Sequence, residues 1–202
     1  MLSRFILIFA LALVAGPASA ATILVFGDSL SAGYGLPQQR GWASLLEKRL
    51  HDEHFDYRVA NASVSGETTI GGAARLKAAL KAHQPDVVVL ELGANDGLRG
   101  QSLDIMRRNL EAMIDASRQA KAQVLLVGMR LPPNYGTAYT EKFRQTYVDL
   151  ARAQKTAFVP FLFEGFAEEA SYFQSDRVHP TTEAQALMLD TIWKGLKPLL
   201  KR

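Results

Sequence analysis

The sequence offers few side chains that could act as a nucleophile and its base. Its 202 residues include no cysteine and only four histidines, so covalent catalysis would need a hydroxyl group beside an imidazole. Ser29 is placed for this, because it directly follows a short apolar segment and Gly27 before it permits a sharp turn. The missing cysteine also excludes a disulfide scaffold, a thiolate zinc site and an N-terminal lipoprotein anchor.

Among the histidines, His179 is the best candidate for the base. Asp176 stands three residues before it, close enough on a short turn to accept the Nδ1–H and leave Nε2 free. The alternative is a surface Asp–His pair that caps the next helix, which Pro180 is placed to start. This spacing alone does not separate the two interpretations. The other histidines are expected at helix ends in solvated or dipole-compensating positions, without a third metal ligand: His51, His54 and His83.

These candidates must be positioned by alternating strands and helices. Five short apolar segments rich in β-branched residues are predicted strands, and helical periodicity appears between them. This order predicts a parallel sheet covered by helices on both faces, a single α/β domain. The predicted strands cover residues 22–26, 57–60, 87–90, 123–129 and 157–160, and the clearest helices cover 68–82 and 182–200 and include the apolar faces Leu103, Met106, Leu110, Met113, Ile114 and Phe143, Tyr147, Leu150, Ala151.

Glycines follow the first three predicted strands. Gly27, Gly66 and Gly93 each lie just past a strand's carboxyl end. Ligands bind at that edge of an open α/β sheet, and glycine lets backbone N–H groups approach a ligand closely. Glycines in these loops could also simply form turns, which is the preferred interpretation for Gly71, Gly72 and Gly100.

The sequence around Ser29 lacks the α/β-hydrolase signature and the known nucleotide-binding signatures. The nucleophile elbow of α/β-hydrolases needs glycine two residues after the serine, and Ser31 stands there. Walker and dinucleotide-binding patterns are also missing. Instead, four blocks over the whole predicted domain resemble the SGNH (GDSL) hydrolase family. In order, they are Gly27-Asp28-Ser29-Leu30, Asn61-Ala62-Ser63-Val64-Ser65-Gly66, Gly93-Ala94-Asn95-Asp96 and Asp176-Arg177-Val178-His179.

This resemblance implies a role for each candidate residue. Ser29 would be the nucleophile, His179 the base and Asp176 the residue that orients it. The oxyanion donors would be the backbone N–H groups of Ser29 and Gly66 and the side-chain amide of Asn95, although an asparagine there could also close its own loop. The resemblance implies a flavodoxin-like three-layer α/β/α fold with a five-stranded parallel sheet. Four loops meeting at one sheet edge would surround one carbonyl group.

Longer motifs resemble the small periplasmic acyl-CoA thioesterase I group, also described as lysophospholipases and arylesterases. This implies hydrolysis of fatty acyl esters and thioesters through an acyl-enzyme, with no cofactor or metal. Ala94 stands where glycine is common in that group. The motifs are Gly27-Asp28-Ser29-Leu30-Ser31-Ala32-Gly33-Tyr34, Asn95-Asp96-Gly97-Leu98-Arg99-Gly100 and Arg130-Leu131-Pro132-Pro133-Asn134-Tyr135-Gly136.

An acyl chain would need an apolar groove beside the oxyanion hole. Apolar residues on strand-end loops are costly to expose, so Leu98, Leu131, Pro132 and Tyr135 are the predicted substrate-binding residues. The alternative is that they fold back onto the core or stiffen a loop. An aromatic-rich stretch is more often core than binding site, and this interpretation is preferred for Phe161, Phe163, Phe166, Tyr172 and Phe173.

Two other functions remain open at this stage. The first is a carbohydrate O-acetyl esterase, which the same family contains and which would favour short acyl groups. The second is a non-catalytic periplasmic binding module that keeps the fold. Intact Ser29, Asp176, His179 and Asn95 argue against the second.

The first twenty residues have the pattern of a secretory signal. A positive start, an apolar run over residues 5–15 and a small-residue cleavage site at 18–20 predict cleavage after Ala20. The predicted domain therefore covers 21–202 and is periplasmic or secreted, with no later segment long enough for membrane insertion. Basic residues are scattered, so no nucleic-acid partner is expected. The protein is expected to act as a monomer on a small-molecule substrate, and its compartment favours lysophospholipids or other exported esters over acyl-CoA.

Overall fold

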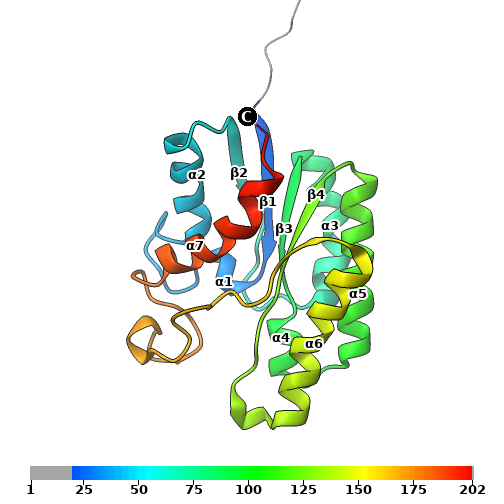
Figure 1. Cartoon of the computed structure of the whole chain (residues 1–202), viewed down its shortest axis with the longest axis vertical. Helices are drawn as coiled ribbons and strands as arrows, with labels where there is room; N and C mark the ends of the chain where they lie inside the picture. Colours follow the sequence, from blue (N-terminus) through cyan, green and yellow to red (C-terminus); the bar gives the residue numbers. More distant parts are fainter. Residues whose placement is uncertain (1–19, 202) are drawn as a thin grey trace, which may run out of the picture.

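Five parallel strands form one sheet in the computed structural model of the protein, which describes residues 20–201 (Figure 1). All neighbouring strands pair in parallel, in the order β2-β1-β3-β4-β5. The five predicted strands are confirmed, except that β4 ends two residues early because its partner β3 stops beside it. The bounds are β1 Ala21–Gly27, β2 Tyr57–Asn61, β3 Val87–Glu91, β4 Gln123–Val127 and β5 Ala157–Val159.

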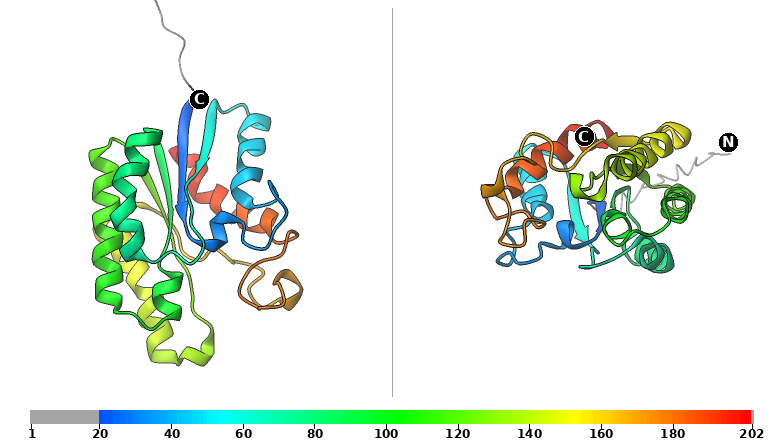
Figure 2. Two further views of the ribbon diagram at one scale, coloured as in Figure 1. Left: turned by 180° about the vertical axis from the view of Figure 1, so that it is seen from behind. Right: turned by 90° about the horizontal axis from the view of Figure 1, so that it is seen from below.

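Helices cover both faces of this sheet. The helices α2 and α7 pack side by side on one face, while α3, α5 and α6 form the layer on the other (Figures 1 and 2). This arrangement and the strand order confirm the predicted flavodoxin-like α/β/α fold. The helices are α1 Ser29–Ala32, α2 Trp42–Asp52, α3 Thr69–His83, α4 Ala94–Leu98, α5 Leu103–Gln119, α6 Thr137–Gln154 and α7 Gln185–Leu196, with 3-10 turns η1 Pro133–Tyr135, η2 Ala170–Tyr172 and η3 Lys197–Leu199.

The core lies between these layers. Every residue of β3 is buried, as expected for a central strand covered on both faces. The predicted apolar faces of α5 and α6 point into the core, and all of their residues named from the sequence are buried. The aromatic stretch also packs inward, because Phe161, Phe163 and Phe166 are at most 7% exposed and their rings contact one another. This confirms the core interpretation for these three residues, while Tyr172 and Phe173 are half-buried and pack against the core.

The last helix differs from its prediction at both ends. Pro180 does not start it, because residues on either side of Pro180 pair with the segment around Phe173. Gln174 N–H donates to His179 O at 2.8 Å and Thr181 N–H to Tyr172 O at 2.8 Å. These bonds keep the chain extended, so α7 begins only at Gln185. At the other end, the helix gives way to the short η3 turn, which contains a proline.

The N-terminal prediction falls largely outside the structure. The signal segment at residues 1–20 lies beyond the described residues except for Ala20. Among residues 20–201, none of the helices combines the length and apolar character needed to cross a membrane.

Candidate active site

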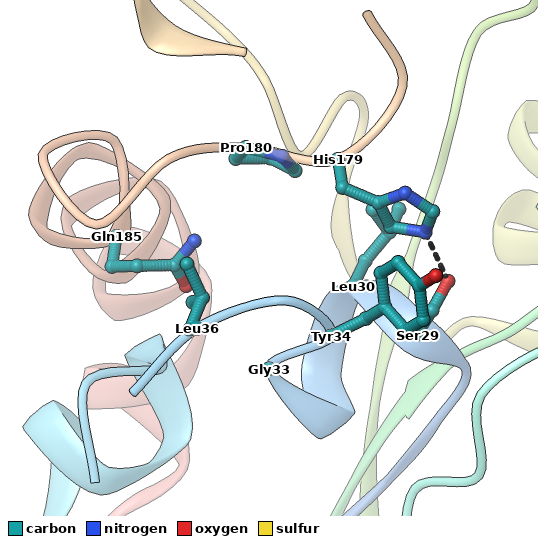
Figure 3. A pocket seen from close by; sticks show the side chains of 8 residues that line it. All are labelled: Ser29, Leu30, Gly33, Tyr34, Leu36, His179, Pro180 and Gln185. Atoms are coloured by element: carbon teal, nitrogen blue, oxygen red, sulfur yellow. Dashed lines mark hydrogen bonds between the residues drawn. The ribbon is translucent and has the colours of Figure 1, made fainter. Parts of the chain in front are cut away.

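Ser29 and His179 meet at the carboxyl edge of the sheet. Ser29 is the first residue of α1, and His179 comes from the loop between β5 and α7. The Nε2 atom of His179 lies 2.9 Å from Ser29 Oγ, although the two residues are 150 positions apart (Figure 3). The structure therefore brings together the predicted nucleophile and base.

Asp176 holds His179 from the opposite side of the ring. Its Oδ2 lies 2.7 Å from His179 Nδ1, and its Oδ1 accepts the backbone N–H groups of Val178 and His179 at 2.9 and 3.0 Å. Burial opposes ionisation of Asp176, but these hydrogen bonds and the nearby imidazole outweigh it and lower its pKa to about 2. The ionised carboxylate favours the tautomer in which Nε2 accepts a proton from Ser29.

The two residues before Ser29 shape the turn that carries it. The Asp28 side chain caps α1 by accepting the Leu30 N–H at 3.0 Å, as N-cap aspartates do. Gly27 is needed because a side chain would not fit there, whereas the sequence predicted a glycine that permits a sharp turn. A Cβ there would lie 2.7 Å from Glu91 Oε2 and 2.8 Å from Glu91 O.

The predicted oxyanion donors come from three separate segments. Gly66, between β2 and α3, has φ +78°, a conformation that favours glycine. Within residues 20–201, no hydrogen bond to another group uses the backbone N–H of Ser29 or Gly66. The Asn95 amide differs, because its Nδ2 donates to Asp28 Oδ2 at 3.1 Å and to Glu67 O at 2.9 Å.

Two buried carboxyl groups lie beneath Ser29. Asp28 and Glu91 are both fully buried, and Ser31 Oγ donates to Glu91 Oε2 at 2.7 Å. Burial raises the pKa of Asp28 to about 6, with hydrogen bonds from Leu30 and Asn95 and the nearby His179 opposing the shift. Burial, with the neighbouring Asp28 charge, holds the pKa of Glu91 well above its usual range.

A tyrosine ring lies against the imidazole of His179. The ring centroids of Tyr34 and His179 are 4.5 Å apart and tilted by 40° (Figure 3). Gln174 fixes this contact, because its Nε2 donates to Tyr34 O at 2.9 Å and to Pro180 O at 3.1 Å. Sequence reasoning missed Tyr34, since no local pattern links it to His179. It also missed Asp28, whose place just before a helix start was a detectable capping signal.

The four predicted acyl-binding residues gather around the end of α4. Tyr135 O–H donates to Leu98 O at 3.1 Å. Leu131 is only 8% exposed and belongs to the core. Pro132 is exposed just before η1. None of the four lines the shallow pocket beside Ser29 in Figure 3, so their contact with substrate stays a prediction.

Comparison with known proteins agrees with this geometry. The model of the GDSL-like lipase/acylhydrolase family matches residues 25–187, a range that includes the Ser29, Asp176 and His179 cluster. The chain belongs to this family. The predicted family is thereby confirmed, and the protein is an SGNH-type hydrolase. No group of residues suited to holding a metal ion occurs in the described part of this hydrolase.

Individual relatives match this hydrolase over most of its length. The esterase TesA of Pseudomonas aeruginosa is 49% identical, with 95% of each chain covered. Thioesterase 1/protease 1/lysophospholipase L1 of Escherichia coli K12 is 40% identical, with 91% of this chain and 86% of that protein covered. A crystal structure of TesA superposes with a TM-score of 0.87 at 50% identity, covering 89% of this chain and 99% of the other.

Proposed function

We propose that the protein hydrolyses fatty acyl esters and thioesters, with Ser29 as nucleophile, His179 as base and Asp176 as the residue that orients His179. One observation carries this proposal: an unbroken hydrogen-bonded series runs from Asp176 Oδ2 through the imidazole to Ser29 Oγ, with distances of 2.7 and 2.9 Å. A neutral imidazole held this way can accept the serine proton as the hydroxyl attacks.

The reaction proceeds in two half-reactions. Ser29 Oγ bonds to the acyl carbon while its proton passes to His179 Nε2, and the carbonyl oxygen becomes an oxyanion. The N–H groups of Ser29 and Gly66 and the Asn95 amide stabilise that charge. When the tetrahedral intermediate collapses, the departing alcohol or thiol takes the proton from His179. Water then repeats the sequence on the acyl-enzyme, and the acid leaves with Ser29 restored.

The substrate class follows from the relatives and the predicted compartment. Relatives named esterase and thioesterase/lysophospholipase support an acyl substrate. We also propose that residues 1–20 are a cleaved signal and that the mature domain acts in the periplasm or outside the cell. Acyl-CoA is a cytosolic metabolite, so lysophospholipids or other exported esters are the proposed natural substrates.

Substitution of the nucleophile tests the proposal. Ser29→Ala removes the attacking oxygen, so hydrolysis of p-nitrophenyl acyl esters should fall by about 10³-fold or more. Ser31→Ala is the matched control, because Ser31 lies in the same motif but points to Glu91, and it should keep the rate within about threefold. A fluorophosphonate should label the wild type and not the Ser29 variant. Retention of half the wild-type rate by Ser29→Ala would refute the proposal.

A series of esters from C2 to C8 tests the acyl group. A fatty acyl hydrolase should keep or gain kcat/KM as the chain lengthens, since each buried methylene contributes about 0.8 kcal/mol. A steep decline from C2 to C8 would instead indicate an O-acetyl esterase.

A further inference from the structure

The three proposed oxyanion donors are not equivalent in the free enzyme. Those of Ser29 and Gly66 are backbone N–H groups without another acceptor among the described residues. The third donor, the Asn95 amide, has both of its N–H positions engaged, by Asp28 Oδ2 at 3.1 Å and Glu67 O at 2.9 Å. Asn95 can therefore serve an oxyanion only by sharing or exchanging one of these bonds.

The bond to Glu67 is the more firmly held of the two. Arg75 pairs with the Glu67 carboxylate and donates to Ala62 O at 2.6 Å, while Arg99 Nη2 donates to Gly66 O at 3.1 Å. These contacts fix the backbone that accepts from Asn95. The longer bond, to Asp28, lies next to the nucleophile, and its N–H is the one that an oxyanion can share while Asp28 stays in place.

We propose that Asp28 is a positioning residue for the oxyanion hole, whose buried carboxylate, together with the Glu67 carbonyl, fixes the direction of the Asn95 amide beside Ser29. An ionised carboxylate and a backbone carbonyl only accept hydrogen bonds, so Asp28 and Glu67 O both select the NH₂ end of Asn95 over its carbonyl end. With the opposite orientation, the Asn95 oxygen would face the developing oxyanion and repel it. Asp28 acts through Asn95 and does not touch substrate.

The position of Asp28 explains why this carboxylate is buried at all. A charge with no exposed surface is expensive unless it is well bonded. Among the described residues, the Asp28 side chain accepts only from the Leu30 N–H and the Asn95 amide, and a second carboxyl group, Glu91, lies beside it. A capping role alone could be met by serine or asparagine. Selecting one end of an amide requires a group that cannot donate.

The test is a double-mutant cycle with Asp28→Asn and Asn95→Ala. Asparagine keeps the shape of Asp28 and its cap on Leu30. It offers an NH₂ group to Asn95, so the Asn95 amide is repelled at one of its two acceptors while Glu67 O remains. Losing one oxyanion donor typically lowers kcat about 10²- to 10³-fold, so Asn95→Ala should fall in that range. Asp28→Asn should lower kcat at least about tenfold with KM within about threefold. The double variant should be no slower than Asn95→Ala, because both changes disable one donor.

Ser31→Ala is the matched control for disturbance of the buried turn. It removes the hydrogen bond to Glu91 in the same cluster without touching Asn95, so its kcat should stay within about threefold of wild type. Circular dichroism establishes that each variant is folded. Multiplicative losses in the double variant, or a kcat above half of wild type in folded Asp28→Asn, would overturn the inference.

The inference rests on the proposed role of Ser29, and the two can fail separately. If Ser29→Ala keeps activity, the proposed function is wrong. If Ser29→Ala is inactive but Asp28→Asn keeps its kcat, only the role of Asp28 is wrong.

Discussion

Replacing Asp176 by asparagine should lower the activity of the protein without lowering its stability. The Oδ1 atom could still accept the N–H groups of Val178 and His179, now at 2.9 and 3.0 Å. The new NH₂ group would stand where Oδ2 now lies, 2.7 Å from His179 Nδ1. A donor there makes Nδ1 the acceptor and places the ring proton on Nε2, which can then no longer receive the Ser29 proton.

The expected loss of kcat depends on how exposed the Asp176–His179 pair is. The same substitution in a buried triad lowers kcat about 10⁴-fold. The Asp176 side chain is 41% exposed here, so water can partly replace its interaction with the imidazole, and we expect a loss of about 10²- to 10³-fold. Steady-state hydrolysis of a p-nitrophenyl ester measures this directly.

Asp176→Ala provides the comparison. It also removes the acceptor for two backbone N–H groups, each contributing about 0.5–1.5 kcal/mol. At roughly 2–4 °C per kcal/mol for a domain of this size, its melting temperature should fall by several degrees. Asp176→Asn should melt within about 1 °C of wild type. Activity above one third of wild type in Asp176→Asn, or equal melting losses in the two variants, would refute this reasoning.

Two further predictions concern stability. The pKa of Asp28 is raised from 3.8 to about 6 in the folded state, so its stabilising contribution is complete below pH 4 and is lost as the pH rises through 6. That difference in pKa corresponds to about 3 kcal/mol in the free energy of unfolding. Urea unfolding should show that this free energy declines between pH 4 and 7, and that it declines less in Asp28→Asn. Equal slopes against pH in the two proteins would contradict the prediction. Gly97→Ala would place a Cβ 2.6 Å from Phe143 Cε2 and 2.9 Å from Leu131 Cδ2. This overpacking should cost about 1–3 kcal/mol, and an unchanged melting temperature would show that the site relaxes.

Local patterns were enough to predict the architecture and to select the candidate site residues. The strands could be predicted directly from their runs of apolar, β-branched residues, because central parallel strands are buried on both faces. Ser29, Asp176 and His179 were predicted because a chain without cysteine leaves few nucleophiles, and family motifs then assigned their roles. The hydrogen bonds at 2.7 and 2.9 Å agree with that assignment.

The rest depended on contacts between distant segments. The start of α7 was mispredicted at Pro180, because an antiparallel bridge to Phe173 keeps that segment extended. The tilted ring contact between Tyr34 and His179 and the hydrogen bond between Asn95 and Asp28 each join two loops that only the sheet brings together. Sequence by itself determined which residues are chemically able to act, because side-chain type and local periodicity are encoded there. Only the tertiary structure decided which of those groups share hydrogen bonds, because that depends on where four loops converge.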